Sequence, residues 1–205
     1  MDRDKLIQYI IELQSIAQAG LYYAKDHYDK ERYERIREIS AEIMAQKTEL
    51  PLDKVKDLFC TDYGYQTPKI DTRAAVFKDG KILLVQERDG RWALPGGWCE
   101  VTLSPVENVI KEVKEEAGID VLVKSIIAVQ NRDNHNKPPY AYGVVKLFYM
   151  CEEIGGTFMK NTETLDAKYF DEDNLPTLAT EKCTAEQINM CFNAHRSNQW
   201  TVLFD

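Results

Sequence analysis

Three glutamates stand close together near the end of a predicted helix. Glu112, Glu115 and Glu116 occupy positions i, i+3 and i+4, so a helix places their carboxylates on one face. Acidic side chains are unfavourable near a helix C-terminus, and packed like charges raise carboxylate pKa values unless a cation lies between them. Carboxylate oxygens select Mg²⁺ or Mn²⁺, ions that often bridge protein carboxylates and substrate phosphates. The spacing therefore favours a divalent-metal site.

The same run of charges has a second interpretation. Lys111 and Lys114 alternate with the glutamates and could pair with them on a solvated helix face, which would contribute little to stability. The surroundings favour the metal site. Gly96-Gly97 opens a loop before the helix, Ser104-Pro105 predicts the start of the helix, and Gly118 predicts its end.

The stretch from Leu94 to Ile119 resembles the Nudix box, Gly-x5-Glu-x7-Arg-Glu-U-x-Glu-Glu-x-Gly-U, in which U is aliphatic. Aligned from Gly97, the Arg-Glu of the box falls on Lys111-Glu112, its Glu-Glu on Glu115-Glu116 and its Gly-U on Gly118-Ile119. By resemblance, Glu112 and Glu116 are the principal metal ligands. Glu115 is a further ligand and a catalytic candidate.

The resemblance also implies a fold and a reaction. Nudix hydrolases are α/β proteins, α/β/α sandwiches with a mixed sheet, that cleave a nucleoside diphosphate linked to another moiety X. The implied mechanism is metal-assisted attack of water on a phosphorus of the pyrophosphate.

Two positions depart from the box. Leu103 replaces its first glutamate and Lys111 its arginine, two residues that interact in the family. Lys111 can still pair with an acid, and Glu100 in the preceding loop could supply one. The substitution also removes one candidate base, so we expect the base in a loop after the box, where Glu163 is our first choice and Asp166 the second.

Several residues outside the helix are candidates for contact with the substrate. Arg73, Arg88 and Arg132 are candidates to bind the diphosphate, although any single one of them is more often a surface charge. His135 lies in a polar loop that could close over X, although a solvent-exposed loop histidine is the more ordinary interpretation. The remaining two candidates are the loop glycines Gly96 and Gly97.

The periodicity of apolar residues divides the chain. It predicts helices over 4–19, ending at Gly20, and over 29–46 and 52–59, so that residues 1–62 form an N-terminal helical domain for dimerisation or substrate binding. Residues 69–205 form the Nudix domain. Its predicted elements are a hairpin around Asp79-Gly80, strands at 92–94, 121–123, 126–129, 142–149 and 168–170, a loop over 131–140, and a helix over 181–195.

The overall composition restricts the partners. A net charge of −8 argues against a broad nucleic-acid surface or an anionic-membrane surface. No run of about 18 apolar residues could span a membrane, and the amphipathic N-terminus does not resemble a signal peptide. The five cysteines are scattered without a Cys-x-x-Cys pair, as expected of reduced thiols in a cytoplasmic protein.

The N-terminal helices together with Leu94–Glu100 resemble a bacterial subgroup of CDP-choline or ADP-ribose pyrophosphatases. The resemblance implies a homodimer and Mg²⁺-dependent hydrolysis of CDP-choline to CMP and phosphocholine, with ADP-ribose as the alternative substrate. Leu103 keeps open a nucleotide-binding sensor with weak catalysis, whereas the extra helices disfavour a hydrolase of damaged nucleoside triphosphates. Four tyrosines in the first two helices could pack in the core, stack on a base or contact a second subunit: Tyr22, Tyr23, Tyr28 and Tyr33.

Overall fold

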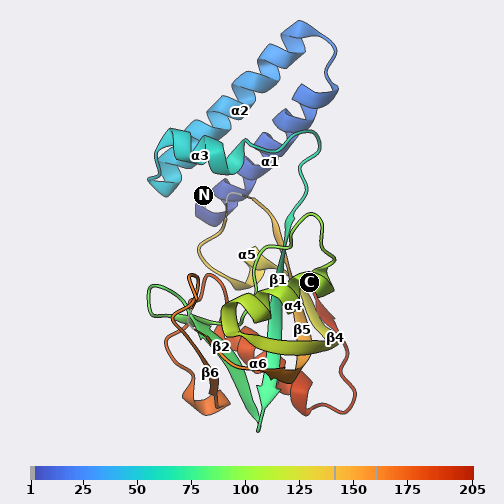
Figure 1. The fold of residues 1–205 in the computed structure, drawn as a ribbon. Helices are drawn as coiled ribbons and strands as arrows, with labels where there is room; N and C mark the ends of the chain where they lie inside the picture. The colour runs from blue at the N-terminus through green and yellow to red at the C-terminus, as the bar shows by residue number, and fades with distance from the viewer. Residues whose placement is uncertain (1–2, 141, 160) are drawn as a thin grey trace. The chain divides into compact units, whose positions relative to one another are not determined.

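A computed structural model describes residues 3–140, 142–159 and 161–205 of the chain (Figure 1). The chain divides into two compact units, one formed by Met1–Pro68 with Pro139–Gly143 and the other by Lys69–Pro138 with Val144–Asp205. Residues 139–143 thus group with the helices, where a Cβ at Gly143 would lie 3.3 Å from the Cβ of Pro68.

The first unit contains the three predicted helices, α1 (Arg3–Tyr23), α2 (His27–Thr48) and α3 (Leu52–Phe59). Their buried apolar side chains form one small core of Ile7, Ile10, Ala41, Met44, Val55 and Phe59. The prediction that α1 ends at Gly20 is wrong. Gly20 lies inside the helix, where an added Cβ would lie 2.4 Å from the ring of Tyr33, so the glycine allows close packing of α1 on α2.

The second unit is built on a mixed sheet in the order β3-β2-β1-β5-β4-β7, with β6 pairing with β2. The β1–β5 and β4–β7 pairs are parallel and the others antiparallel. The strands are β1 (Lys69–Lys78), β2 (Lys81–Gln86), β3 (Trp92–Ala93), β4 (Ile119–Asn131), β5 (Val144–Gly156), β6 (Asp166–Phe170) and β7 (Leu203–Phe204).

The hairpin between β1 and β2 is confirmed, since Asp79 and Gly80 both take positive φ, as a two-residue turn requires. The two strands predicted at 121–123 and 126–129 are one strand, β4, because register shifts near Lys124 carry it across the polar interruption. The predicted loop over 131–140 contains the short helix α5 (Arg132–His135). A short 3₁₀ turn, Glu172–Asn174, follows β6.

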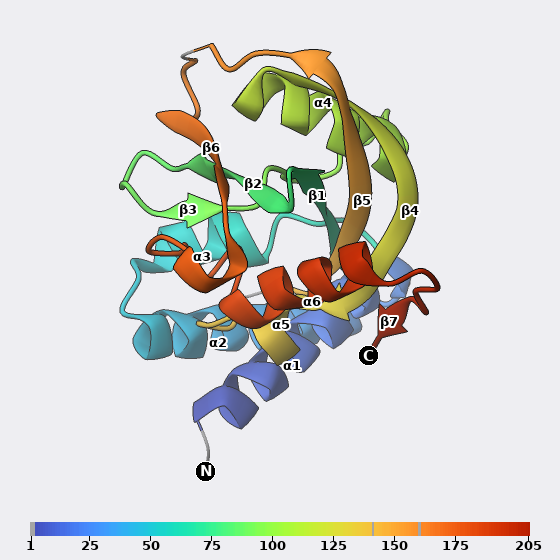
Figure 2. The same ribbon diagram turned by 90° about the horizontal axis from the view of Figure 1, so that it is seen from below.

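Helices α4 (Pro105–Ala117) and α6 (Ala185–Arg196) cover opposite sides of the sheet (Figure 2). Under α4, the core includes Val76, Val85, Val109 and Val113. On the α6 side, it includes Ile82, Leu84, Phe148 and Ile188. The α/β/α sandwich with its mixed sheet is therefore confirmed. In the described part of the chain, no helix combines the length and apolar character needed to cross a membrane.

Candidate functional site

The predicted boundaries of the glutamate helix, α4, are confirmed. Ser104 caps its N-terminus in a capping box, in which the Ser104 hydroxyl accepts from Glu107 N–H and the Glu107 carboxylate accepts from Ser104 N–H. Gly118 ends the helix at φ 70°, a left-handed conformation that favours glycine. Val109, Val113 and Ala117 are buried against the sheet, and this packing fixes where the glutamate face points.

Glu116 lies almost completely buried, at 8% exposure, and one carboxylate oxygen accepts a hydrogen bond of 2.8 Å from Gly96 N–H. Burial raises its pKa to about 7, against the opposing charge of Arg73. The loop can pass this close to β1 because residue 96 is a glycine. A Cβ at Gly96 would lie only 2.0 Å from the carbonyl oxygen of Thr72. A side chain at position 96 would therefore force the loop away from β1 and from Glu116.

Glu112 lies against the second loop glycine. A Cβ at Gly97 would be 2.9 Å from Glu112 Oε2, so the glycine leaves room for the carboxylate beside the backbone. Burial raises the pKa of Glu112, and the nearby carboxylates of Glu115 and Glu163 raise it further. The Glu112 and Glu116 carboxylates therefore both adjoin the same Gly96-Gly97 turn.

Glu115 is the exposed member of the three and pairs with Lys111. The Lys111 ammonium also lies 3.2 Å from Glu100 Oε1 and 4.0 Å from Glu112 Oε1. These acids raise the pKa of Lys111, and the hydrogen bond that Lys111 donates to Glu115 contributes most. The expected pairing of Lys111 with Glu100 is thus present, in a chain that has Leu103 where the box has its glutamate.

The carboxylates of Glu112, Glu115 and Glu116 offer only oxygen ligands, which fit a hard divalent cation. Burial disfavours the ionised form of Glu112 and Glu116, and a bound cation would offset this penalty. The side chains would have to move to bind one. Among the residues that the structure describes, no three His, Cys, Asp or Glu side chains already converge on a point that could hold a metal ion. The Glu115 carboxylate in particular is paired with Lys111 and would have to leave it.

The loop before β6 is fastened to the end of α4. Thr164 Oγ1 and Asn161 Nδ2 donate to the carbonyl oxygen of Glu116, at 2.6 and 3.2 Å. Asn161 Oδ1 in turn accepts from Glu163 N–H and Thr164 N–H, which fixes the turn. Glu163 is thereby held, exposed, close enough to Glu112 to raise its pKa.

Two further residues of this region differ in their surroundings. Arg88, in the connection between β2 and β3, is exposed and donates from Nε to the carbonyl oxygen of Thr162 at 3.0 Å, so its side chain contacts the loop that carries Glu163. Asp166, the second choice for the base, pairs with Lys168 and caps the N–H of Ala167. This leaves Glu163 as the more accessible of the two acids.

Arg73 and Arg132 are both buried, with exposed fractions of 5% and 1%. Arg73 donates to both oxygens of Asp71 and to the carbonyl oxygen of Leu94. Arg132 donates to Asp133 and to the carbonyl oxygens of Pro138 and Glu181. These placements argue against the predicted direct contact of either guanidinium with a diphosphate.

His135 lies on α5, where its Nε2 is 2.9 Å from Asp205 Oδ2. Asp205 also accepts from Asn134 Nδ2 and from Asn131 N–H. These contacts tie the α5 segment to the C-terminal residues. The predicted closure of this loop over the substrate remains a prediction.

Sequence reasoning missed the polar residues that hold the site in place. Asn108 is fully buried, donates to Thr72 Oγ1 at 2.9 Å and accepts from Glu100 N–H at 3.1 Å, so it joins α4, β1 and the loop. A polar residue on the otherwise apolar side of a predicted helix was the available signal. Thr164 and Asn161 carried no comparable signal, because polar residues are ordinary in a loop.

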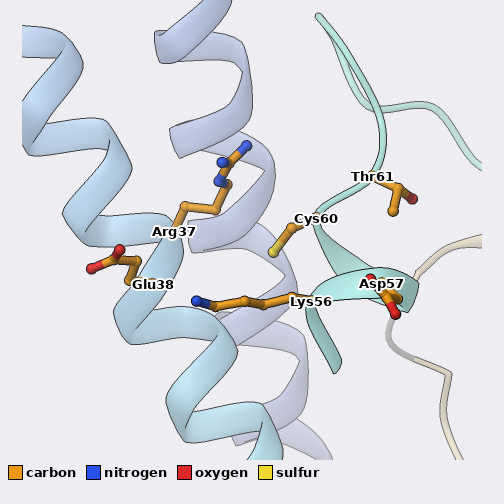
Figure 3. A pocket seen from close by; sticks show the side chains of 6 residues that line it. All are labelled: Arg37, Glu38, Lys56, Asp57, Cys60 and Thr61. Carbon is orange, nitrogen blue, oxygen red and sulfur yellow. The ribbon is translucent and has the colours of Figure 1, made fainter. Parts of the chain in front are cut away.

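A separate hollow of about 280 Å³ lies within the helical unit, lined by Arg37, Glu38, Lys56, Asp57, Cys60 and Thr61 (Figure 3). Lys56 extends from α3 toward α2. The two basic side chains are matched by two acidic ones, so the hollow favours neither anions nor cations. Burial raises the pKa of the Cys60 thiol, which disfavours the reactive thiolate.

Comparison with known families matches both parts of the chain. Residues 68–188, more than half of its length, match the family described as the NUDIX domain. Residues 4–59 match a family described as a UDP-X-like, N-terminal oligomerisation domain.

Two relatives carry names that refer to ADP-ribose. The Bacillus subtilis (strain 168) protein YjhB, whose name gives it ADP-ribose pyrophosphatase activity only provisionally, is 43% identical over 194 residues, covering 94% of this chain and 93% of that protein. The ADP-ribose pyrophosphatase of Methanocaldococcus jannaschii is 33% identical over 119 residues, covering 56% and 69%.

Two solved structures are also similar. A crystal structure of an ADP-ribose pyrophosphatase from Streptococcus suis 89-1591 is 49% identical with a TM-score of 0.64, covering 68% of this chain and 100% of that chain. A crystal structure of a UDP-X diphosphatase is 32% identical with a TM-score of 0.64, covering 99% and 100%. The match to the UDP-X diphosphatase therefore includes the N-terminal helices of this chain as well as its sheet.

Proposed function

Because the chain belongs to the Nudix family of pyrophosphohydrolases, we propose that its substrate is ADP-ribose, which water would split into AMP and ribose 5-phosphate. The names of the relatives from B. subtilis, M. jannaschii and S. suis support ADP-ribose. They do not mention CDP-choline, the substrate first expected. The UDP-X names belong to the helical family and to one similar structure, so a UDP-linked sugar is the other substrate to compare.

The observation that carries the site assignment is the position of the partly buried Glu112 and the buried Glu116 beside the Gly96-Gly97 loop. Divalent cations, Mg²⁺ or Mn²⁺, would neutralise charge on the pyrophosphate oxygens and favour ionisation of the attacking water. Glu112 and Glu116 would hold them, with Glu115 assisting once it leaves Lys111. The Gly96 N–H fixes the orientation of the Glu116 carboxylate.

We assign the proton transfer to Glu163. Its loop is hydrogen-bonded to the last turn of α4 through Asn161 and Thr164, which keeps the Glu163 carboxylate near Glu112. An exposed acid in this position can accept a proton from water and release it to solvent. Arg88 follows β2 and is hydrogen-bonded to the carbonyl oxygen of Thr162 in this loop, so it is the arginine best placed to contact the diphosphate.

We also propose that the protein is a homodimer formed through α1. Tyr9, Leu13 and Ile16 follow one side of this helix at helical spacing and are 44–53% exposed, while the opposite side packs in the core. The description of the helical family as an oligomerisation domain supports this assignment.

The direct test is hydrolysis of a panel of substrates with Mg²⁺ or Mn²⁺ and with EDTA. We expect ADP-ribose to be cleaved with a higher kcat/KM than CDP-choline, a UDP-linked sugar or nucleoside triphosphates, and EDTA to abolish the reaction. Glu112→Gln and Glu116→Gln should each lower kcat by more than about 100-fold, since even residues behind metal ligands typically contribute 10–100-fold.

Glu152→Gln is the matched control, because Glu152 is an exposed acid of β5 that pairs with Lys124. Its kcat should equal that of the unaltered protein. Unchanged turnover in Glu112→Gln and Glu116→Gln would refute the metal-site assignment. Tight binding of one nucleotide without turnover of any would instead support the sensor that Leu103 keeps open, and faster cleavage of CDP-choline would restore the first expectation.

A further inference from the structure

Three charged side chains lie buried together on the α6 side of the sheet, next to the glycine loop. Asp71 and Arg73 are on β1 and Lys146 is on β5, with exposed fractions of 6%, 5% and 0%. Strands β1 and β5 lie side by side and pair in parallel (Figure 1). Their register places Asp71 directly opposite Lys146. These side chains are too buried to meet a substrate, and the proposed reaction uses none of them.

Their contacts form one network centred on Asp71. Arg73 donates from Nε to Asp71 Oδ1 at 2.8 Å and from Nη2 to Asp71 Oδ2 at 3.1 Å, a two-pronged pair. Lys146 Nζ lies 3.5 Å from Asp71 Oδ2 and also donates to the carbonyl oxygen of Lys182. One carboxylate therefore orients two cationic side chains.

Stability alone does not explain such a group. Two buried cations share one carboxylate, and the cost of removing charges from water often exceeds the gain from pairing them. Burial and the neighbouring Arg73 charge lower the pKa of Lys146 to about 8, which shows the unfavourable side of this balance. Apolar side chains of similar volume could fill the same space at lower cost.

The network reaches the glycine loop through Arg73. The third prong of its guanidinium, Nη1, donates to the carbonyl oxygen of Leu94 at 3.1 Å. The next three residues are Pro95, Gly96 and Gly97, and β1 holds this segment from its backbone, with Ala74 N–H donating to Pro95 and Thr72 N–H to Gly97, both at 2.9 Å. Gly96 N–H then donates to Glu116.

We propose that Arg73, held by Asp71 and Lys146, is a positioning residue that sets the Leu94–Gly97 segment and through it the orientation of Glu116. The inference rests on the proposed function, since it takes Glu116 to be a metal ligand. It replaces the predicted contact of Arg73 with the diphosphate by an indirect role. Only an arginine supplies three donors in one plane, two for Asp71 and one for the Leu94 carbonyl.

The test compares Arg73→Lys with Asp71→Asn, each measured for Mn²⁺ affinity by electron paramagnetic resonance, for kcat and KM with ADP-ribose, and for melting temperature. Arg73→Lys keeps the charge and loses the fork. We expect its Mn²⁺ affinity and kcat to fall by about 10–100-fold, the range seen for residues that orient metal ligands, with KM changed by less than about threefold. Asp71→Asn should shift both quantities in the same direction.

Gln187→Leu is the matched control. Gln187 is 2% exposed, and its side-chain Nε2 donates hydrogen bonds to Gln130 Oε1 and Asn136 Oδ1. These three residues form a second buried polar group in the same unit. This substitution should lower the melting temperature and leave Mn²⁺ affinity unchanged.

If Arg73→Lys and Asp71→Asn only lower the melting temperature, as Gln187→Leu does, the network serves folding and the inference is wrong. Glu116→Gln separates this failure from failure of the proposed function. If Glu116→Gln loses Mn²⁺ affinity while Arg73→Lys keeps it, only the positioning role is refuted. If neither Glu116→Gln nor Glu112→Gln alters Mn²⁺ binding, both proposals fail.

Discussion

At the scale of single residues, Lys111 is the feature that most distinguishes this site from the family pattern. Its ammonium lies among the carboxylates of Glu100, Glu112 and Glu115 and acts as a cation that the chain itself supplies. It therefore relieves the repulsion that three acids on one helical face would otherwise suffer. A divalent cation bound by the same carboxylates would meet both the repulsion of this charge and its competition for Glu115.

We therefore predict that Lys111→Met binds Mn²⁺ about 3- to 10-fold more tightly than the unaltered protein. Removing one positive charge a few ångströms from a divalent ion is worth about 1 kcal/mol in a partly exposed site. Lys111→Arg, which keeps the charge, should stay near the original affinity. Isothermal titration calorimetry of each protein with Mn²⁺ measures the effect.

Lys114→Met provides the comparison on the same helix, because Lys114 pairs with Asp120 at 2.7 Å and also donates to the Gly118 carbonyl. Its Mn²⁺ affinity should change little. Weaker binding by Lys111→Met would show that Lys111 organises the carboxylates, contrary to the competition argued here.

At the scale of elements, the pairing of β1 with β5 places Lys146 opposite Asp71. Its pKa of about 8 in the folded protein lies below the value of about 10.4 for an unfolded chain. Between these values the unfolded state binds more protons, so the contribution of Lys146 to stability rises with pH. Below pH 8 both states are protonated and the burial penalty is complete.

We expect Lys146→Met to remove this dependence. The variant should gain the most stability over the unaltered protein below pH 8. This difference in the free energy of unfolding should decline by about 3 kcal/mol as pH approaches 10.5. Asp71, Arg73 and Cys183, which surround Lys146, are present in both proteins. Urea unfolding at pH 7.5, 9 and 10 provides the measurement, and a difference constant with pH would contradict the prediction.

The elements also show what the sequence could predict. The boundaries of α4 followed from Ser104, Pro105 and Gly118, because caps act through neighbouring backbone groups. Gly20 misled the prediction, since its role depends on Tyr33 of another helix. The spacing of residues predicts a structural feature when the two interacting residues are close in sequence. The prediction fails when they are far apart in sequence.

The candidate site follows the same rule. The three glutamates and two glycines were found from one continuous stretch, and the structure places Glu112 and Glu116 beside the glycine turn. The sequence suggests Arg73 as a substrate contact because nothing in it pairs Arg73 with Leu94, or Asp71 with Lys146. These contacts depend on the order of strands in the sheet.

At the scale of the whole molecule, the helical unit has a core too small to explain all its apolar residues. On α1, Ile7 and Ile10 are buried, whereas Tyr9, Leu13 and Ile16 on the other side are exposed. An exposed apolar stripe of this kind is costly in a monomer and typical of a surface that pairs with another chain. A two-fold dimer brings the same stripe of two copies together, so one substitution acts twice.

We predict that the unaltered protein sediments as a dimer at micromolar concentration, and that the double variant Leu13→Glu, Ile16→Glu is a monomer at the same concentration. Two buried glutamates on each chain would place four like charges in an apolar interface, which is strongly unfavourable. Leu122→Glu is the control, since Leu122 is half exposed on β4 in the other unit, and it should remain dimeric. Circular dichroism must show unchanged helix content, because Leu13 and Ile16 lie outside the core of the helical unit. Sedimentation of the double variant as a dimer would exclude this side of α1 as the interface.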